Sequence, residues 1–458
     1  MEITFRLNGD DVTVATDDPT LTLLDWLRED RGLRGTKEGC NEGDCGACSV
    51  VVTSRDGVRA LNACILFLPQ LHGKVVRTVE GIAAPDGTLH PVQAAMVERH
   101  GSQCGFCTPG FVTTMAAAHL AGATDHADQV AGNLCRCTGY APILAACVDA
   151  AEAPVPDHMH DEPPATPAMV GTGAFAPRDG NDLAEWYVDH PDATLVAGAT
   201  DVGLWVTKQF RDLGDVAFLA GCEDLKVIEQ DADVIRIGAM VDMERLRHAV
   251  APLHPQFAEM LRRYGSVQVR NAATVGGNIA NGSPIGDSPP PLIALGARLH
   301  LRRGGERRDI ALEDFFLDYG RQDRRPGEFV EAVTIPRQPD RLHVAKLSKR
   351  FDQDISAVCG AFNLPTTDGV LSGVRVAFGG MAGVPKRARA VESALEGRAL
   401  TADVLRAAAD RFADDFQPLS DMRASAAYRL AACRGMLMRL GTGSARSVMD
   451  LDAAGVAR

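Results

Sequence analysis

Hydrophobic and polar residues alternate along the first part of the chain. Residues 3–8 and 12–16 carry apolar side chains at every second position, and Gly9-Asp10 lies between the two runs. This period of two predicts a β-hairpin. Apolar residues at helical spacing then predict a helix over residues 20–30, and residues 47–53 have the pattern of a strand. Together these elements indicate a small β-grasp domain with a loop between its helix and its next strand.

The hydrophobic period becomes helical after residue 91. Thr108-Pro109 is typical of a cap and first helical position, and helices are predicted over residues 92–100, 111–120, 125–133 and 142–151. The following stretch, residues 152–168, contains five prolines among acidic residues and histidines. We expect an exposed linker there, with His158 and His160 solvated rather than bound to a metal.

The C-terminal part of the chain combines strand and helix patterns. Strands are predicted at residues 343–347, 357–364 and 371–378, followed by helices between residues 387 and 440, which is an α+β pattern. The changes of pattern predict a multidomain α+β protein. Its expected parts are residues 1–80, 81–151, a linker at 152–168, residues 169–342 and residues 343–458.

Composition narrows the class of function. The chain has 458 residues, with 47 Lys and Arg against 60 Asp and Glu, a net charge of −13. An acidic chain lacks the positive surface that binds phosphate backbones or anionic lipid, so nucleic-acid and membrane partners are not expected. The first residues show no secretory signal, and no apolar run approaches the roughly 20 residues of a membrane helix. We therefore expect a cytoplasmic protein.

The first of two cysteine groups comprises Cys40, Cys45, Cys48 and Cys64. Four residues separate the first two cysteines, two separate the next pair, and 15 precede the last. This is the spacing of a plant-type [2Fe–2S] centre. Three glycines within residues 39–48 would let backbone N–H groups approach the anionic sulfurs closely.

The second group comprises Cys104, Cys107, Cys135 and Cys137, at the ends of predicted helices. Its last pair is separated by a single residue, unlike the two to four residues of ordinary zinc sites, which favours an iron–sulfur centre. The alternative is a zinc scaffold, with two zinc sites or one zinc site beside one cluster. The remaining cysteines are isolated and are expected to be small buried side chains: Cys147, Cys222, Cys359 and Cys433.

Two glycine-containing segments are candidates for binding a dinucleotide. In the first, a short apolar strand beginning at Thr194 reaches Gly198 and runs into a predicted helix over residues 202–210. Backbone N–H groups at such a turn can bind a pyrophosphate. The second, residues 271–287, supplies adjacent glycines, hydroxyl and amide side chains and a carboxylate. The alternative is an ordinary strand–helix turn and a convoluted loop.

Several segments together resemble the molybdenum hydroxylase family. They are Gly35-Thr-Lys-Glu-Gly-Cys-Asn-Glu-Gly-Asp-Cys-Gly-Ala-Cys, Gln103-Cys-Gly-Phe-Cys-Thr-Pro-Gly, Asn133-Leu-Cys-Arg-Cys-Thr-Gly-Tyr, residues 196–202, residues 273–287 and Phe378-Gly-Gly-Met-Ala. A chain with both kinds of module and no molybdenum domain is similar to the small subunit of the bacterial xanthine dehydrogenases. The resemblance implies a plant-ferredoxin-like domain, a helical-bundle [2Fe–2S] domain, a vanillyl-alcohol-oxidase-type FAD domain and a small C-terminal flavoprotein domain.

The resemblance also implies roles for individual residues. The second cysteine group would face the molybdopterin of a separate large subunit, with Gln103 and Cys137 nearest to the pterin, and the first group would lie toward FAD. FAD would be held by Val196, Ala197, Gly198, Ala199, Thr200, Asp201, Val202, Tyr264, Thr274, Gly277, Asn278, Asp287 and Lys346.

The activity implied is that of an NAD-dependent xanthine dehydrogenase. Electrons from hypoxanthine or xanthine would pass from molybdenum through two [2Fe–2S] clusters to FAD and on to NAD⁺, in a heterotetramer of two small and two large chains. No catalytic acid, base or nucleophile is expected in this chain, because the cofactors carry the chemistry. The alternatives are a related hydroxylase acting on an aldehyde or another N-heterocycle, dioxygen as the acceptor, or a free-standing iron–sulfur flavoprotein reductase.

Overall fold

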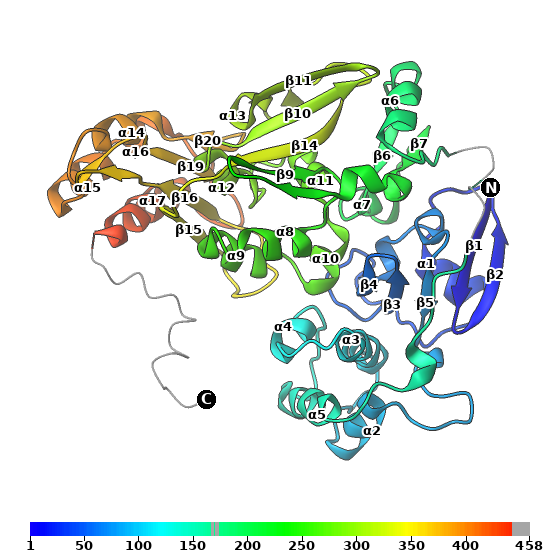
Figure 1. Cartoon of the computed structure of the whole chain (residues 1–458). Helices are drawn as coiled ribbons and strands as arrows, with labels where there is room; N and C mark the ends of the chain where they lie inside the picture. The colour runs from blue at the N-terminus through cyan, green and yellow to red at the C-terminus, as the bar shows by residue number, and fades with distance from the viewer. Residues whose placement is uncertain (166–168, 170–173, 442–458) are drawn as a thin grey trace.

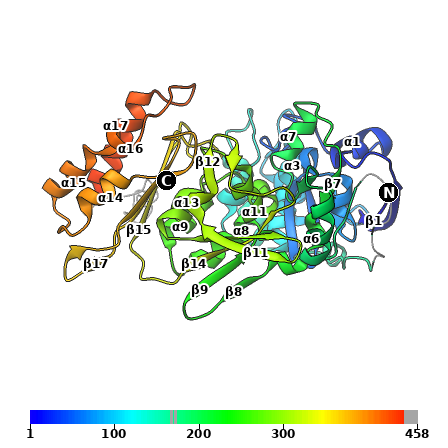
Figure 2. The ribbon, with the colours of Figure 1, turned by 90° about the horizontal axis from the view of Figure 1, so that it is seen from above.

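The computed structural model describes residues 1–165, 169 and 174–441. The end of the predicted linker, residues 166–168, and the end of the predicted last domain, residues 442–458, lie outside the described residues. The described chain forms an elongated α+β structure (Figures 1 and 2). The N-terminal sheet lies at one end of it, and the C-terminal helices lie at the other.

The first unit is a five-stranded sheet of strand order β2-β1-β5-β3-β4. The predicted hairpin is confirmed, and its turn is Asn8-Gly9, where both residues have positive φ. The alternating apolar residues of β1 are buried in the core of this unit. The strands are β1 (Glu2–Leu7), β2 (Asp10–Ala15), β3 (Ser49–Ser54), β4 (Gly57–Asn62) and β5 (Val75–Arg77).

The helix predicted over residues 20–30 is shorter and less regular than expected. Helix α1 (Leu23–Asp25) begins after Thr22, whose hydroxyl accepts a hydrogen bond from the amide of Asp25. The chain then continues as a π-helical turn, Trp26–Asp30. The hydrophobic period identified the buried face, but it does not distinguish an α-helical turn from a π-helical one.

The second unit consists of four helices beside this sheet (Figure 1). All four were predicted, and they are α2 (Pro91–Glu98), α3 (Thr108–Leu120), α4 (His126–Val130) and α5 (Ala141–Ala151). Their core includes Val51 and Ala60 from the sheet, so the two units share apolar contacts.

The prediction of an exposed linker after α5 is wrong for the part around residues 155–161. Met159 is buried in the core of the helical unit. The guanidinium of Arg77 pairs with Asp161 at 2.6 Å, and both side chains are largely buried. His158 is not a fully solvated residue, since its Nε2 lies 3.0 Å from the carbonyl oxygen of Ile82. The proline content therefore predicted a segment that connects two units, but it did not predict that this segment packs against the helical unit.

The third unit contains the largest core, in which helices pack against an antiparallel sheet of order β11-β10-β14-β9-β8. A separate parallel pair, β6 (Thr194–Val196) and β7 (Val216–Phe218), lies beside α7 (Val202–Thr207). The other elements are α6 (Gly180–Asp189), β8 (Ile228–Gln230), β9 (Val234–Gly238), α8 (Met243–Val250), α9 (Pro255–Arg262), α10 (Val267–Ala272), α11 (Val275–Asn281), α12 (Pro289–Ala294), β10 (Arg298–Arg303), β11 (Glu306–Ala311), α13 (Leu312–Phe315), β12 (Phe316–Asp318), β13 (Arg321–Gln322) and β14 (Phe329–Pro336).

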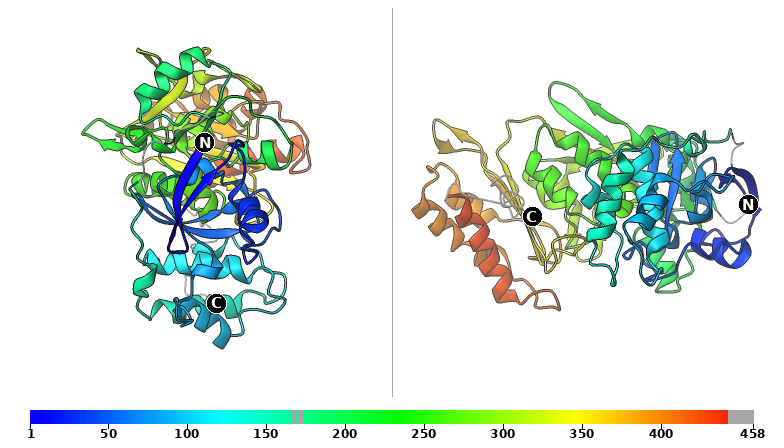
Figure 3. Two further views of the ribbon diagram at one scale, coloured as in Figure 1. Left: turned by 90° about the vertical axis from the view of Figure 1, so that its right-hand side faces the viewer. Right: turned by 90° about the horizontal axis from the view of Figure 1, so that it is seen from below.

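The last unit has the predicted order of strands followed by helices (Figure 3). Its sheet has the order β15-β16-β19-β20, and four helices pack on it. No helix in the described residues is both long and apolar enough to cross a membrane. The elements are β15 (Leu342–Leu347), β16 (Val358–Asn363), β17 (Thr366–Thr367), β18 (Val370–Leu371), β19 (Arg375–Gly379), β20 (Lys386–Arg387), α14 (Arg389–Leu395), α15 (Ala402–Ala409), α16 (Phe412–Asp415) and α17 (Ala426–Leu440).

The first three units meet at the side chain of Gln268, on α10. Its amide nitrogen lies 3.1 Å from the hydroxyl of Ser49 on β3, 3.2 Å from that of Thr114 on α3, and 2.9 Å from the side-chain oxygen of Asn133. All four side chains are buried. The amide nitrogen of Gln268 thus links the three units, although its side-chain oxygen has no partner among the described residues.

We therefore expect Gln268→Leu to weaken the junction. Leucine removes the only donor shown to reach all three partners, and leaving a buried polar group unpaired costs about 1–3 kcal/mol. The first thermal unfolding transition of the full chain should move to lower temperature. Gln129→Leu is the control, because that side chain bonds only to Asp125 at the surface among the described residues. Equal transitions for the two variants would contradict this role of Gln268.

Candidate functional site

The first cysteine group lies on a loop that precedes β3 and on the short turn after β4. Gly43 and Gly46 have positive φ, which directs main-chain amides toward the sulfurs. The amide of Gly43 donates to Cys64 Sγ at 3.2 Å, and the amides of Asp44 and Cys45 both donate to Cys40 Sγ at 3.3 Å. Donors of this kind stabilise anionic sulfur, as the sequence predicted.

The four sulfurs of this group are neighbours. Hydrogen bonds from the thiols of Cys45 and Cys64 lower the pKa of Cys40, and the same contacts raise the pKa of Cys45 and of Cys64. Cys64 also interacts with Cys48, and these two side chains are buried. The contacts thus favour negative charge on the sulfur of Cys40.

The second cysteine group connects two loops of the helical unit. Cys107 is the residue before the first turn of α3, and the Cys135 and Cys137 loop leads toward α5. Cys104 interacts with Cys137, and Cys107 interacts with Cys135. Burial, together with the neighbouring Cys135 thiol, raises the pKa of Cys107 to about 12. The four thiols are therefore neighbours.

The second group is more open than the first. Cys104 and Cys137 are exposed, whereas Cys107 and Cys135 are half-buried. Gln103 is exposed on the same loop as Cys104. No three His, Cys, Asp or Glu side chains among the described residues are placed to hold a single metal ion. The four isolated cysteines are buried, as expected: Cys147, Cys222, Cys359 and Cys433.

The two cysteine loops touch one another through their main chains. The amide of Leu134, next to Cys135, donates to the carbonyl oxygen of Cys45 at 3.0 Å. The side-chain amide of Asn133 donates to the carbonyl oxygen of Gly46 at 2.9 Å. One hydrogen bond and a few covalent bonds thus separate a cysteine of one group from a cysteine of the other.

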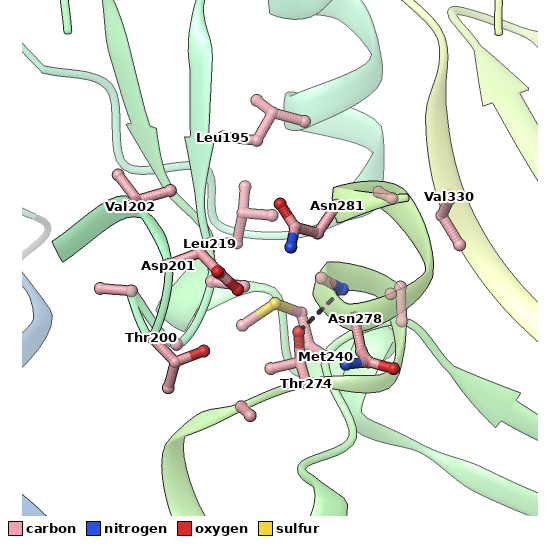
Figure 4. Close-up of a pocket in the computed structure, with 18 of the residues that line it drawn as sticks. Leu195, Thr200, Asp201, Val202, Leu219, Met240, Thr274, Asn278, Asn281 and Val330 are labelled. Carbon is pink, nitrogen blue, oxygen red and sulfur yellow. Dashed lines mark hydrogen bonds between the residues drawn. The ribbon is translucent and has the colours of Figure 1, made fainter. Parts of the chain in front are cut away.

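A cavity of about 320 Å³ lies in the third unit, between the β6–α7 loop, α11 and β14 (Figure 4). It brings together most of the residues predicted to hold the flavin. Those that line it are Ala197, Gly198, Ala199, Thr200, Asp201, Val202, Tyr264, Thr274, Gly277 and Asn278. The two glycine-containing segments, about 75 residues apart in the sequence, are therefore neighbours in the fold.

Gly198 is required for this approach. A Cβ on Gly198 would lie 1.7 Å from the carbonyl oxygen of Ala272 at the end of α10. Any side chain here would push the β6–α7 loop away from α10 and from the adjoining α11. The sequence indicated a turn at this glycine. The structure shows that Gly198 also allows the loop to pack closely against the end of α10.

The two segments differ in the amides they offer to a ligand. At the start of α11 the amides of Val275, Gly276 and Gly277 donate to Val241, Ala239 and the Thr274 hydroxyl (Figure 4). In contrast, none of the amides from 198 to 202 has an acceptor in the described part of the chain. Ala199 has a φ of 58°, which helps to form a concave run of N–H groups. The first segment is thus the better anion-binding loop.

Three residues predicted to contact the flavin do not line the cavity. Val196 is fully buried in a small apolar core. Asp287 and Lys346 form a buried ion pair at 2.5 Å, and Ser356 bonds to both of them. The charges of Asp287 and Lys346 are already paired with each other. These two residues could therefore affect a bound ligand only indirectly, through the residues that line the cavity.

Tyr264 and Asn278 form a polar wall of the cavity. The Asn278 amide donates to the Tyr264 hydroxyl at 3.2 Å, and the Asn278 carbonyl oxygen accepts from Ser288. Burial raises the pKa of Tyr264, so that the phenol stays protonated near neutral pH. Burial also raises the pKa of Asp201.

Sequence reasoning missed other residues of the cavity. Met240, Asn281, Val330 and Arg324 line it, although no motif marks them. Arg324 is the only cationic residue among the described lining residues. The hydrogen bonds of Arg308 to Asp323 and of the Arg325 amide to Glu328 hold the main chain on either side of it. The arginine-rich stretch at 321–325 could have drawn attention to it.

Four family models match the chain, and together they cover most of it. Residues 5–68 match a 2Fe-2S iron-sulfur cluster binding domain, and residues 78–148 match a [2Fe-2S] binding domain. Residues 170–338 match the FAD binding domain in molybdopterin dehydrogenase. Residues 343–442 match the CO dehydrogenase flavoprotein C-terminal domain.

Curated relatives agree with these matches. Xanthine dehydrogenase of Drosophila pseudoobscura pseudoobscura is 33% identical over 463 residues, covering 83% of this chain and 34% of that protein. Xanthine dehydrogenase/oxidase of Rattus norvegicus is 30% identical over 456 residues, with coverages of 83% and 34%. The chain belongs to the molybdenum hydroxylase family. It is an iron–sulfur and FAD chain of this family, and it spans about a third of the length of these relatives.

Solved structures of the family's enzymes are also similar to the chain. Carbon monoxide dehydrogenase from Hydrogenophaga pseudoflava aligns with a TM-score of 0.55 and 27% identity, covering 59% of this chain and 96% of that chain. Quinoline 2-oxidoreductase from Pseudomonas putida 86 aligns with a TM-score of 0.55 at 23% identity, which shows a shared fold alone.

We expect Gly198→Val to abolish flavin retention, because the added side chain would overlap the carbonyl of Ala272. The flavin content of the purified full chain should fall to near zero, while its iron content stays close to that of the wild type. Gly305→Ala is the control, since a Cβ there meets nothing within 4 Å. Full flavin content in Gly198→Val would show that the cavity is not the flavin site.

Proposed function

We propose that this chain is the electron-transfer subunit of a xanthine dehydrogenase. A partner chain would carry the molybdenum cofactor and hydroxylate hypoxanthine and xanthine to urate. This chain would relay the electrons through two [2Fe–2S] clusters to FAD and on to NAD⁺, in a cytoplasmic heterotetramer of two small and two large chains. The observation that carries the proposal is the direct contact between the two cysteine loops, in a chain whose third unit holds a cavity of about 320 Å³ lined by both glycine-containing segments.

We assign each four-cysteine group to one cluster. The first group fits a cluster because three main-chain amides donate to Cys40 and Cys64, and donors of this kind stabilise the charge of thiolates and sulfides. The second group fits because its four thiols lie close enough to interact with one another. Gln103 and Cys137 would lie nearest to the pterin of the partner, since both are exposed.

We assign FAD to the cavity of the third unit. The free amides from 198 to 202 would hold the diphosphate, and Arg324 would balance its charge. Tyr264 and Asn278 would pack beside the ring system, with the ion pair of Asp287 and Lys346 behind them. When bound, the clusters supply single-electron transfer and the flavin supplies exchange of electron pairs. The residues of this chain fix the positions of these groups and exclude water from them.

The second candidate is a related hydroxylase with another substrate. It is favoured by the similarity to carbon monoxide dehydrogenase from Hydrogenophaga pseudoflava. The substrate pocket would lie in the partner chain, so assays of the purified complex with xanthine, an aldehyde and carbon monoxide separate these candidates. Flavin reduction by xanthine supports the first proposal, and its absence beside reduction by another substrate supports the second.

Cys137→Ser tests the proposed direction of electron transfer. In complex with the partner, reduction of FAD by xanthine should slow by an order of magnitude or more, because a changed ligand disturbs the cluster on the molybdenum side. Reduction of FAD by NADH should stay close to the wild-type rate. Stopped-flow absorbance of the flavin measures both. If NADH reduction fell as far as xanthine reduction, the proposed order of the two clusters would be wrong.

Arg324→Met tests the proposed charge balance in the cavity. We expect FAD affinity to fall by about tenfold, or roughly 1.4 kcal/mol, because a diphosphate loses its only cationic neighbour among the described lining residues. Fluorescence titration of the flavin-free chain measures this affinity. Arg325→Met is the matched control on the same loop, since Arg325 does not line the cavity and pairs with Glu306 at the surface. Equal affinities of the two variants would contradict the role of Arg324.

A further inference from the structure

Helix α7 touches both proposed cofactor sites. At its beginning, Asp201, Val202 and Trp205 line the flavin cavity. At its end, Thr207 and Lys208 contact the loop of the first cysteine group. The helix has only six residues, so its two ends are less than 10 Å apart at about 1.5 Å per residue. One short element thus separates the cavity from the cysteine loop.

The contacts at the end of α7 are directed to main-chain carbonyls. The hydroxyl of Thr207 donates to the carbonyl oxygen of Asn41 at 2.9 Å. The ammonium of Lys208 donates to the carbonyl oxygen of Cys40. Asn41 has a φ of 56°, a left-handed conformation that asparagine adopts more readily than most residues. The two side chains therefore hold the cysteine loop at the residue that begins the first group.

Packing holds the same two elements together. A Cβ on Gly203, in α7, would lie 2.9 Å from Cβ of Ile65, the residue after Cys64. The helix thus lies against the turn that carries the last cysteine of the group. A hydrogen bond also joins the first and third units nearby. The Gln70 side chain donates to the carbonyl oxygen of Ala197 at 2.9 Å.

A helix of this length is not stable alone, because nucleation of a helix is unfavourable. The order of α7 must therefore come from its tertiary contacts, which include those at its two ends. Contacts added at one end reduce the opening of the whole helix, and so they also strengthen the contacts at the other end. This relation is reciprocal for binding free energies.

We propose that α7 couples the two cofactor sites, so that FAD in the cavity protects the cluster of Cys40, Cys45, Cys48 and Cys64 from loss. Thr207 and Lys208 are the positioning residues of this coupling. The inference rests on the proposed placement of a cluster at the first cysteine group and of FAD in the cavity. It adds that the two sites are filled cooperatively.

The test compares the loss of each cluster with and without FAD. The full chain is purified anaerobically with both clusters, divided into flavin-free and FAD-saturated samples, and treated with an iron chelator. Visible absorbance follows the rate of loss, and EPR of the reduced samples shows which cluster is lost. In the wild type, FAD should slow loss of the first cluster by roughly fivefold or more and leave the rate for the second cluster unchanged.

The decisive variant combines Thr207→Val and Lys208→Met. FAD should still bind to it, because neither residue lines the cavity, but its affinity for the cluster-loaded chain should fall by about the factor that the lost coupling contributed. At saturating FAD, the flavin should no longer slow loss of the first cluster. Gln209→Met is the matched control at the same end of α7, and it should keep the full protection. Thermal unfolding and circular dichroism confirm that the double variant is folded. The single variants Thr207→Val and Lys208→Met measure how much each contact contributes to the protection of the first cluster.

The outcomes separate this inference from the proposed function. If the double variant keeps the protection, or if FAD binds to the wild type without protecting the first cluster, the coupling through α7 is wrong. If FAD protects both clusters equally, the effect is global and is not transmitted by α7. If the wild type binds no FAD or carries no cluster, it is the proposed function that fails.

Discussion

The structure depends on close contact between the two cysteine loops. Charge on sulfur is costly to bury unless donors and close-packed main chain replace water. The contact is possible because the facing residues lack side chains: a Cβ on Gly46 would lie 2.4 Å from the carbonyl oxygen of Gly132, and one on Gly110 would lie 2.2 Å from that of Gly46. The buried network of Gln268 closes the same junction from the flavin-binding side. The positions of both cysteine groups relative to the cavity follow from this junction.

The two cysteine groups differ in burial in a way that suits a relay. Cys48 and Cys64 are enclosed, and their loop lies against α7, which leads to the cavity. Cys104 and Cys137 are exposed. An enclosed centre exchanges electrons only with what lies beside it inside the chain. An exposed centre needs a partner to exclude water from it, which is the arrangement proposed here for the molybdenum-binding chain.

The sequence predicted most of what is local. The hairpin, the four helices after residue 91 and both cysteine groups were identified because periodicity and short spacings are visible within a few residues. The docking of the predicted linker was missed, since it depends on Arg77 and Asp161, 84 residues apart. Likewise, no local pattern reveals that the amides before Asn278 are already used, or that Asp287 and Lys346 pair with each other outside the cavity. Partners chosen by tertiary packing carry no signal in the linear sequence.

Several of the bonds between the units share a feature that helps to explain why motifs describe each unit and not their assembly. A side chain on one unit donates to a main-chain carbonyl on the other: Lys208 to Cys40, Gln70 to Ala197, Asn133 to Gly46, and Asn271 to Ala60. The accepting residue contributes only a carbonyl, which every residue has. At these contacts the position of one unit on the other follows the path of the backbone, so residues that shape each site also help to set its distance from the next.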